Sequence, residues 1–462
     1  MIGLLLLSLS AQPETWSVDR IAQRAIETSN GVAASQAELE EASTRRDRAF
    51  VDVLPRARVG FDYTRIGAIT NDPLVDLDVD LTGVAADVAA VQDPAAQSAL
   101  QAQLGVLQGL DGVRIDVPEE RTAFRAELSY PVSALFLEIL PGLRAAERAE
   151  EARAFQLEAL RNDEALRAVE VYLRHVLAQQ GRAVAERTIE EARLDLDQAK
   201  GRLRAGTATE PERLRFEARL AEAEGELAVR EADVLSTRAA LRALLDLEGE
   251  GPLSASEDVG RPQLWSTPKA AGGQEAPPRP ELAAAELLVR AVEARKRSAR
   301  GGAAPKLGVG AGVDVAQPNP LLVPPNTDRF RTTWRVSAGL SWSPDRAASA
   351  WLRSDELSAQ ARRARANLRA VQDQIAIEIA TASARRSAAM AQLAAAERQV
   401  AAAGEALAGR REAYGSGLAD ATEVLAAEVQ LEQARLLRVR SGTQALIEDA
   451  RLRRAYGAAL YE

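Results

Sequence analysis

Few side chains in this sequence have the chemistry that catalysis or metal binding needs. The chain of 462 residues contains no cysteine, which excludes disulfides, thiolate metal ligands and cysteine nucleophiles. Its one histidine, His175, lies in a helical pattern, where we expect a packed or solvated side chain rather than a ligand or a base. The sequence shows no glycine-rich phosphate loop and no Ser/His/Asp set. It therefore predicts no enzyme, no cofactor and no metal site.

Two carboxylates, Glu212 and Glu423, occupy equivalent places in two long Ala/Glu/Arg-rich tracts. Each lies six residues after a glycine, Gly206 or Gly417, at which the helical pattern breaks and restarts at once. The chain is therefore expected to reverse sharply at two equivalent turns. A carboxylate just after such a turn can cap the restarted helix, or it can act as a fixed negative charge, and both roles stay open.

The residue at each restart has the spacing of a helix cap. Thr209 and Glu212 stand three positions apart, as do Asp420 and Glu423, and this is the spacing of a capping box. In such a box the two residues exchange hydrogen bonds across the first turn. We expect Asp420 to act as a cap rather than as a functional acid.

The composition favours long helices packed side by side. Hydrophobic residues make up 47% of the chain, aromatic residues only 4%, and much of the apolar share is alanine. Acids and bases alternate every few residues, giving a net charge of −9, so the basic stripe of a nucleic-acid-binding protein is missing. The predicted helical tracts are 17–53, 142–205, 209–247, 280–300, 347–416 and 420–456. Two of them span on the order of 100 Å at about 1.5 Å per residue.

Four shorter segments alternate apolar and polar residues with a period of two, which predicts β-strands. They form two similar pairs: Leu54–Tyr63 resembles Ala304–Val313, and Phe124–Pro131 resembles Trp334–Trp342. With the two turns, this indicates an internal duplication. The insert between the strands is long in the first copy, 66–121, and short in the second, 316–331.

The number of strands predicts an oligomer. Each segment has about ten residues, enough for a tilted strand to cross a bilayer. A soluble sandwich with one solvated face is the alternative, but two distant hairpins flanked by very long helices argue against it. Four strands cannot close a barrel, and open strand edges are excluded from lipid. Three subunits would give twelve strands around an open lumen, whereas two would give eight around a filled one.

The N-terminus resembles a secretory signal peptide that lacks its positive start. Residues 2–9 are apolar apart from one glycine and one serine, and small residues precede an expected cleavage before Gln12. The rest of the sequence has no run of eighteen apolar residues, so no transmembrane helix is predicted.

Together these elements resemble the TolC-like outer-membrane efflux proteins. The resemblance rests on LPRARVGFDY and APKLGVGAGV, on LSYPV and LSWSP, and on the turns AGTATEPE and SGLADATE, and it spans Trp16 to Gly457. It implies a mainly α fold with a small β part and two internal repeats. Long antiparallel coiled-coil helices would form a periplasmic tunnel. Four strands per protomer would contribute to the twelve-stranded transmembrane β-barrel of a homotrimer in the outer membrane of a Gram-negative bacterium.

The resemblance divides the chain into eight segments. They are a signal peptide (1–11), the periplasmic helices of repeat 1 (12–54), its β-hairpin with a long extracellular loop (55–131), its tunnel hairpin (132–249), an equatorial linker (250–279), the periplasmic helix of repeat 2 (280–304), its β-hairpin (305–344) and its tunnel hairpin (345–462).

The resemblance also implies a role for the turns. They match the tunnel tip, where the family meets a periplasmic adaptor protein and, through it, an inner-membrane pump. The tip residues are Ala205, Gly206, Thr207, Ser416, Gly417 and Leu418, and the candidate gate residues are Glu212, Glu423, Asp420 and Tyr414. Alternatively, the glycines supply only a backbone conformation and Tyr414 only packs between helices.

Two departures from the family pattern concern the gate. Tyr414 matches a tyrosine that helps to hold the tip shut, but Ala419 replaces its arginine partner. Ala426 replaces a further acid, so the ring of carboxylates expected from three copies of Glu212 and Glu423 is thinner. The gate is therefore expected to close by other contacts.

The functional hypothesis is a passive exit duct for small toxic solutes, in contact with outer-membrane lipid and energised by the pump. The exit duct of a type I protein-secretion system is the alternative within the family. A soluble coiled-coil scaffold is the alternative of another class.

Overall fold

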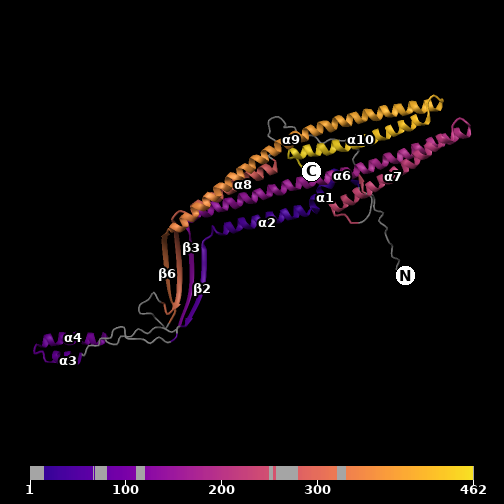
Figure 1. Ribbon diagram of the computed structural model, residues 1–462. Coiled ribbons are helices and arrows are strands. Elements are labelled where there is room, and N and C mark those ends of the chain that lie inside the picture. Colours follow the sequence, from indigo (N-terminus) through magenta and orange to yellow (C-terminus); the bar gives the residue numbers. More distant parts are fainter. Residues whose placement is uncertain are drawn as a thin grey trace, which may run out of the picture. The chain divides into compact units, whose positions relative to one another are not determined.

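The computed structural model describes residues 15–65, 67, 81–110, 120–248, 253–255, 279–319 and 329–460 (Figure 1). The expected signal peptide lies outside these ranges, as do most of the expected linker 250–279 and parts of both inserts. The chain forms two compact units. One consists of residues 1–47, 143–296 and 355–462, and is helical. The other consists of residues 48–142 and 297–354, and contains the strands.

The long helices predicted from the sequence are present, with ends within a few residues of those expected. Their bounds are α1 Val18–Thr28, α2 Asn30–Val51, α6 Leu140–Arg204, α7 Glu210–Leu245, α8 Pro280–Gly301, α9 Pro344–Gly415 and α10 Ala421–Ala455. A three-residue helix, α5 Val132–Ala134, and a π-helical stretch, η1 Leu135–Ile139, precede α6.

The helical tract expected over residues 17–53 consists of two helices in the structure. Ser29 ends α1 with an extended backbone, φ −69° and ψ 118°, which cannot continue a helix. Its hydroxyl then accepts a hydrogen bond from the N–H of Val32 at 3.3 Å, so the same serine begins α2. Serine competes with helix in this way because its short side chain reaches nearby backbone groups.

The main helical core is built mostly from small and medium side chains, together with the larger Trp16 and Tyr172. Ile21, Leu173 and Leu241 are fully buried in it, and several alanines fill the narrow spaces between the helices. Tyr172 anchors the start of the described chain, since its hydroxyl donates to the Trp16 carbonyl at 2.7 Å. There β1, Thr15–Trp16, pairs in parallel with β4, Ser254–Ala255, a contact that the sequence did not predict.

The four predicted strands form one antiparallel sheet in the other unit. They are β2 Arg56–Arg65, β3 Glu120–Tyr130, β5 Lys306–Gln317 and β6 Arg331–Ser341, in the order β2-β3-β5-β6 (Figure 1). The pairing of β3 with β5 joins the hairpins of the two repeats. Among the described residues, neither β2 nor β6 has a second partner strand, so the sheet has two open edges.

The two faces of the sheet differ sharply in chemistry. Cross-strand pairs put apolar side chains on one face, and several are exposed, including Val59 (85%), Trp334 (78%), Val336 (73%) and Leu340 (72%). The opposite face carries glycines and charged side chains. A soluble protein buries such an apolar face, whereas a lipid-facing barrel wall exposes it.

The long insert between β2 and β3 contains two helices, α3 Leu81–Ala89 and α4 Pro94–Leu110. None of the helices in the described ranges has both the length and the apolar character of a membrane span.

Candidate functional site

The two predicted turns have the same backbone geometry. Gly206 and Gly417 adopt φ of +73° and +77°, the left-handed region in which a side chain is strained. In the first turn, the N–H of Thr207 donates to the Arg202 carbonyl at 2.9 Å. In the second, the N–H of Leu418 donates to Ala413 at 2.8 Å. These bonds satisfy the free carbonyls at the end of each helix, and the chain can then reverse.

The turns are solvent-exposed and differ in polarity. In the first, Ala205 and Thr207 are exposed beside Gly206. In the second, Leu418 is 85% exposed, an unusual state for a large apolar side chain. Both turns lie in the helical unit, so the structure brings the predicted tip residues of the two repeats into one compact body.

The first capping box is confirmed and the second is only half formed. Glu212 accepts from the Thr209 N–H at 2.6 Å, and both halves of that box are present. Asp420 accepts from the Glu423 N–H at 3.0 Å, and backbone hydrogen bonding lowers the pKa of Asp420. However, the Glu423 carboxylate does not return to the cap. It pairs with Arg410 instead.

Tyr414 is buried, with 7% of its surface exposed, and it contacts both hairpins. Its ring packs against Phe216 of α7 at 5.9 Å between centroids. The Arg202 guanidinium lies 4.1 Å from the ring centroid, and Arg202 also donates to the Tyr414 carbonyl at 2.7 Å. Burial raises the pKa of Tyr414. The tyrosine therefore has an arginine partner, although Ala419 stands at the position expected to supply one.

Arg202 is a residue that sequence reasoning missed. It comes from α6, more than 200 residues before Tyr414, and no short motif links the two. A second contact of the same kind lies close by, where Arg215 of α7 donates to the Thr422 hydroxyl of α10 at 2.7 Å. Arginines of the first repeat thus hold the second repeat next to the turns.

An ionic cluster joins α6, α9 and α10. Arg411 of α9 reaches Asp195 of α6 at 2.5 Å and Glu428 of α10 at 3.1 Å. Both carboxylates are buried, and one guanidinium cannot neutralise two negative charges. Burial, followed by the adjacent Asp195 carboxyl, raises the pKa of Glu428 to about 8. This shift favours the protonated form of Glu428 at neutral pH.

His175, expected to be either packed or solvated, is packed. The ring is 1% exposed, with Nδ1 3.0 Å from the Thr237 hydroxyl and Nε2 3.0 Å from the Gln179 amide. Burial lowers the pKa of this imidazole. Within the described ranges, no three His, Cys, Asp or Glu side chains cluster as a metal site would require.

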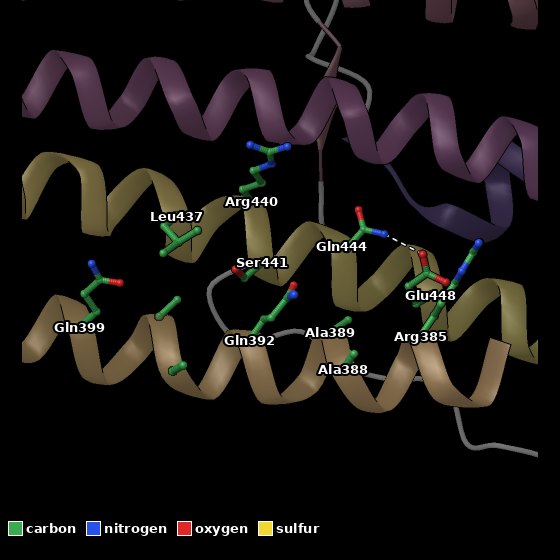
Figure 2. Close-up of a pocket in the computed structure, with 12 residues that line it drawn as sticks. Arg385, Ala388, Ala389, Gln392, Gln399, Leu437, Arg440, Ser441, Gln444 and Glu448 are labelled. Atoms are coloured by element: carbon green, nitrogen blue, oxygen red, sulfur yellow. Dashed lines mark hydrogen bonds between the residues drawn. The ribbon is translucent and has the colours of Figure 1, made fainter. Parts of the chain in front are cut away.

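A cavity of about 650 Å³ lies between α9 and α10, away from the turns (Figure 2). Alanines such as Ala388 and Ala389 leave this space because their side chains are too short to fill it. Amides line it, and Gln444 donates to the Glu448 carboxylate at 2.7 Å. The cavity holds no nucleophile beside a base, so it has no arrangement for catalysis.

Comparison with known proteins supports the resemblance. Residues 274–458 match the sequence family described as outer membrane efflux protein. No curated protein sequence matches the chain. Similar solved structures include CusC (16% identity, 98% of this chain and 96% of that chain, TM-score 0.73). Others are the CmeC outer membrane channel of Campylobacter jejuni (14%, 97% and 90%, 0.71) and the open state of the MtrE outer membrane channel of Neisseria gonorrhoeae (16%, 96% and 89%, 0.71).

These structural matches confirm the predicted fold class. The family match covers most of the second repeat, and the structural likeness extends over nearly the whole chain. The fold is that of a TolC-like protomer, mainly helical with four strands.

Proposed function

We propose that three copies of this chain form an exit duct in the outer membrane of a Gram-negative bacterium, with the helical part in the periplasm. The main observation in support of this proposal is the four-stranded sheet, which has two open edges and an exposed apolar face. Unpaired backbone groups cost several kcal/mol each in lipid, so the strands of three copies must close on one another. The closed wall then surrounds a lumen lined by the polar face.

We further propose that the duct docks through its turns to a periplasmic adaptor and exports small toxic solutes passively. The exposed Leu418 and the small residues of both turns offer a surface for a partner. The family match supports efflux, and a pump must supply the energy because the sequence has no phosphate-binding loop. A soluble scaffold would not expose a face such as that of Val59, Trp334 and Leu340.

Near the turns, we propose that Tyr414 and Arg202 hold a closed tip, and that Glu212 and Glu423 contribute negative charge there. The burial of Tyr414 between two hairpins supports the first role. Glu423 contributes less negative charge than Glu212, because its carboxylate pairs with Arg410. Asp420 is engaged as a helix cap.

Membrane fractionation tests the duct. The chain should appear in the outer-membrane fraction as a trimer whose mobility in gels changes on heating. Crosslinking from Thr207 and Leu418 should capture an adaptor, which would identify the pump and separate solute efflux from protein secretion. A soluble elongated dimer would refute the duct and favour the scaffold.

Planar bilayers test the charge at the tip. Replacing Glu212 and Glu423 by glutamine should lower the cation preference of the conductance, since fixed carboxylates attract cations. Glu217→Gln, on the exposed side of α7, is the matched control and should change nothing. An unaltered preference in the double variant would leave the two glutamates as helix caps and ion-pair partners only.

A further inference from the structure

The polar face of the sheet carries an excess of positive charge. Strand pairing places seven basic and three acidic side chains there, an excess of four positive charges in a chain whose net charge is −9. The basic residues are Arg56, Arg58, Arg121, Arg125, Lys306, Arg331 and Arg335, and the acidic ones are Asp62, Glu127 and Asp314.

Part of this positive charge is neutralised by ion pairs within the sheet. Arg125 lies 3.0 Å from Asp62 and 3.1 Å from Asp314, and Arg335 lies 2.8 Å from Asp314. These ion pairs form a row of alternating charge across all four strands. Arg335 is held flat over Gly312, where an added Cβ would lie 3.4 Å from its Nε. Lys306, at the end of β5, pairs with Glu138 at 2.9 Å.

Four arginines on the same face have no ionic partner among the described residues. Arg56, Arg58, Arg121 and Arg331 form no ion pair with any residue in the described part of the chain. The Nε of Arg121 is buried and has no hydrogen-bond partner there either. Arg58 and Arg121, with the paired Arg125 and Arg335, border a hollow of about 460 Å³ on this face. A guanidinium that is partly withdrawn from water without a partner favours an anion as its ligand.

We propose that this face is an anion-binding surface for solutes that carry carboxylate or phosphate groups. The inference rests on the proposed function, because closure of the barrel turns the face inward and repeats it three times. Inside a narrow lumen with a low-dielectric wall, charges of one sign concentrate counter-ions, and rings of arginine are typical of anion-conducting pores. Anionic cargo then binds at the barrel wall, whereas Glu212 and Glu423 act on ions at the turns.

Single-channel recording with inorganic triphosphate as the probe tests this surface. The purified trimer is placed in a planar bilayer in about 0.1 M KCl, where charges act over about 10 Å. Triphosphate should block the current in a voltage-dependent way, and the block should weaken as salt is raised. In the triple variant Arg58→Gln, Arg121→Gln, Arg331→Gln, the apparent affinity should fall by at least about tenfold, the loss expected for charge-assisted contacts.

Two controls make the result specific. Arg65→Gln should leave the block unchanged, because Arg65 lies on β2 but on the opposite face, where it pairs with Glu120 at 3.7 Å. Arg→Lys changes at the same three positions should keep most of the block, since the charge remains. Equal block in the glutamine variant and the wild type would overturn the anion surface and leave the duct standing. Failure of the wild-type chain to form trimers or channels would overturn both.

Discussion

At the scale of single residues, Glu428 is the group whose protonation depends most clearly on its surroundings. Its pKa of about 8 in the folded protein exceeds the ordinary value of 4.5. The native state therefore keeps a proton that the unfolded chain releases above about pH 4.5, and the free energy of unfolding should fall as pH rises from about 4.5 to 8. Above that range it should be constant with respect to this group.

Thermal unfolding of the detergent-solubilised protein, followed by helical circular dichroism, checks this dependence. Glu428→Gln keeps the shape of the side chain without an ionisable proton, so the change in melting temperature between pH 5 and pH 8 should become smaller. Glu217→Gln, an exposed carboxylate on α7, serves as the control and should retain the full dependence. The protonated pair would be refuted by a Glu428→Gln profile that matches the wild type.

Arg202 carries a second prediction at this scale. Arg202→Gln removes the cation–π contact with Tyr414 and the bond to its carbonyl, together worth about 2 kcal/mol. If these contacts hold the tip closed, single-channel conductance should rise severalfold. Arg204→Gln is the control, because that exposed arginine bonds only to the Lys200 carbonyl of its own helix among the described residues. Unchanged conductance in Arg202→Gln would remove it from the gate.

Neither Arg202 nor Glu428 could be found by sequence reasoning, for a physical reason. Both act through partners on other helices, and a charged residue on a long Ala/Glu/Arg-rich tract looks the same whether it is buried or solvated. Thr209 and Asp420 were predictable because a helix cap is a local structure, with its donor and acceptor only three residues apart.

At the scale of elements, the two turns depend on their glycines. A leucine at the left-handed φ of Gly206 or Gly417 costs roughly 1–2 kcal/mol and adds bulk to the exposed turn. In the double variant Gly206→Leu, Gly417→Leu, export should be lost while trimers persist, because the strands that assemble the barrel are untouched. Efflux-dependent growth in a toxic solute, with trimer content measured in parallel, checks this.

Two further variants interpret that result. Gly409→Leu should export normally, since it is an exposed position within α9 where an added Cβ meets nothing within 4 Å. Asparagine at both turns should retain much of the export, because it tolerates the left-handed conformation better than other non-glycine residues. Normal export by the leucine variant would discard the assignment of the turns as the docking tip.

The helices and strands were largely predictable because their sequence patterns have different periods. Alternation every two residues marked the four strands, and the Ala-rich tracts marked the helices, to within a few residues at most ends. The break at Ser29 was not predictable, since serine also occurs inside helices. The pairing of β3 with β5 and of β1 with β4 joins segments far apart in the chain, and such contacts leave no periodic signal.

At the scale of the whole molecule, assembly should depend on one face of the sheet only. Val336→Arg places a charge on the exposed apolar face, where it costs about 2–4 kcal/mol at the middle of a bilayer. The variant should lose most of its trimer from the outer-membrane fraction. Ser337→Arg, its neighbour in β6, points to the polar face and should assemble normally. Similar trimer yields from both variants would contradict the lipid-facing assignment.

The two turns share a backbone path, yet their chemistry is unequal. One has a complete capping box and the polar Thr207, and the other has a half-formed box, the Arg410–Glu423 ion pair and the protruding Leu418. In the proposed trimer, three polar loops would alternate with three loops that expose an apolar side chain. A partner with six subunits would therefore contact two different kinds of loop. Its subunits must either bind both kinds equally well or arrange themselves as three dimers.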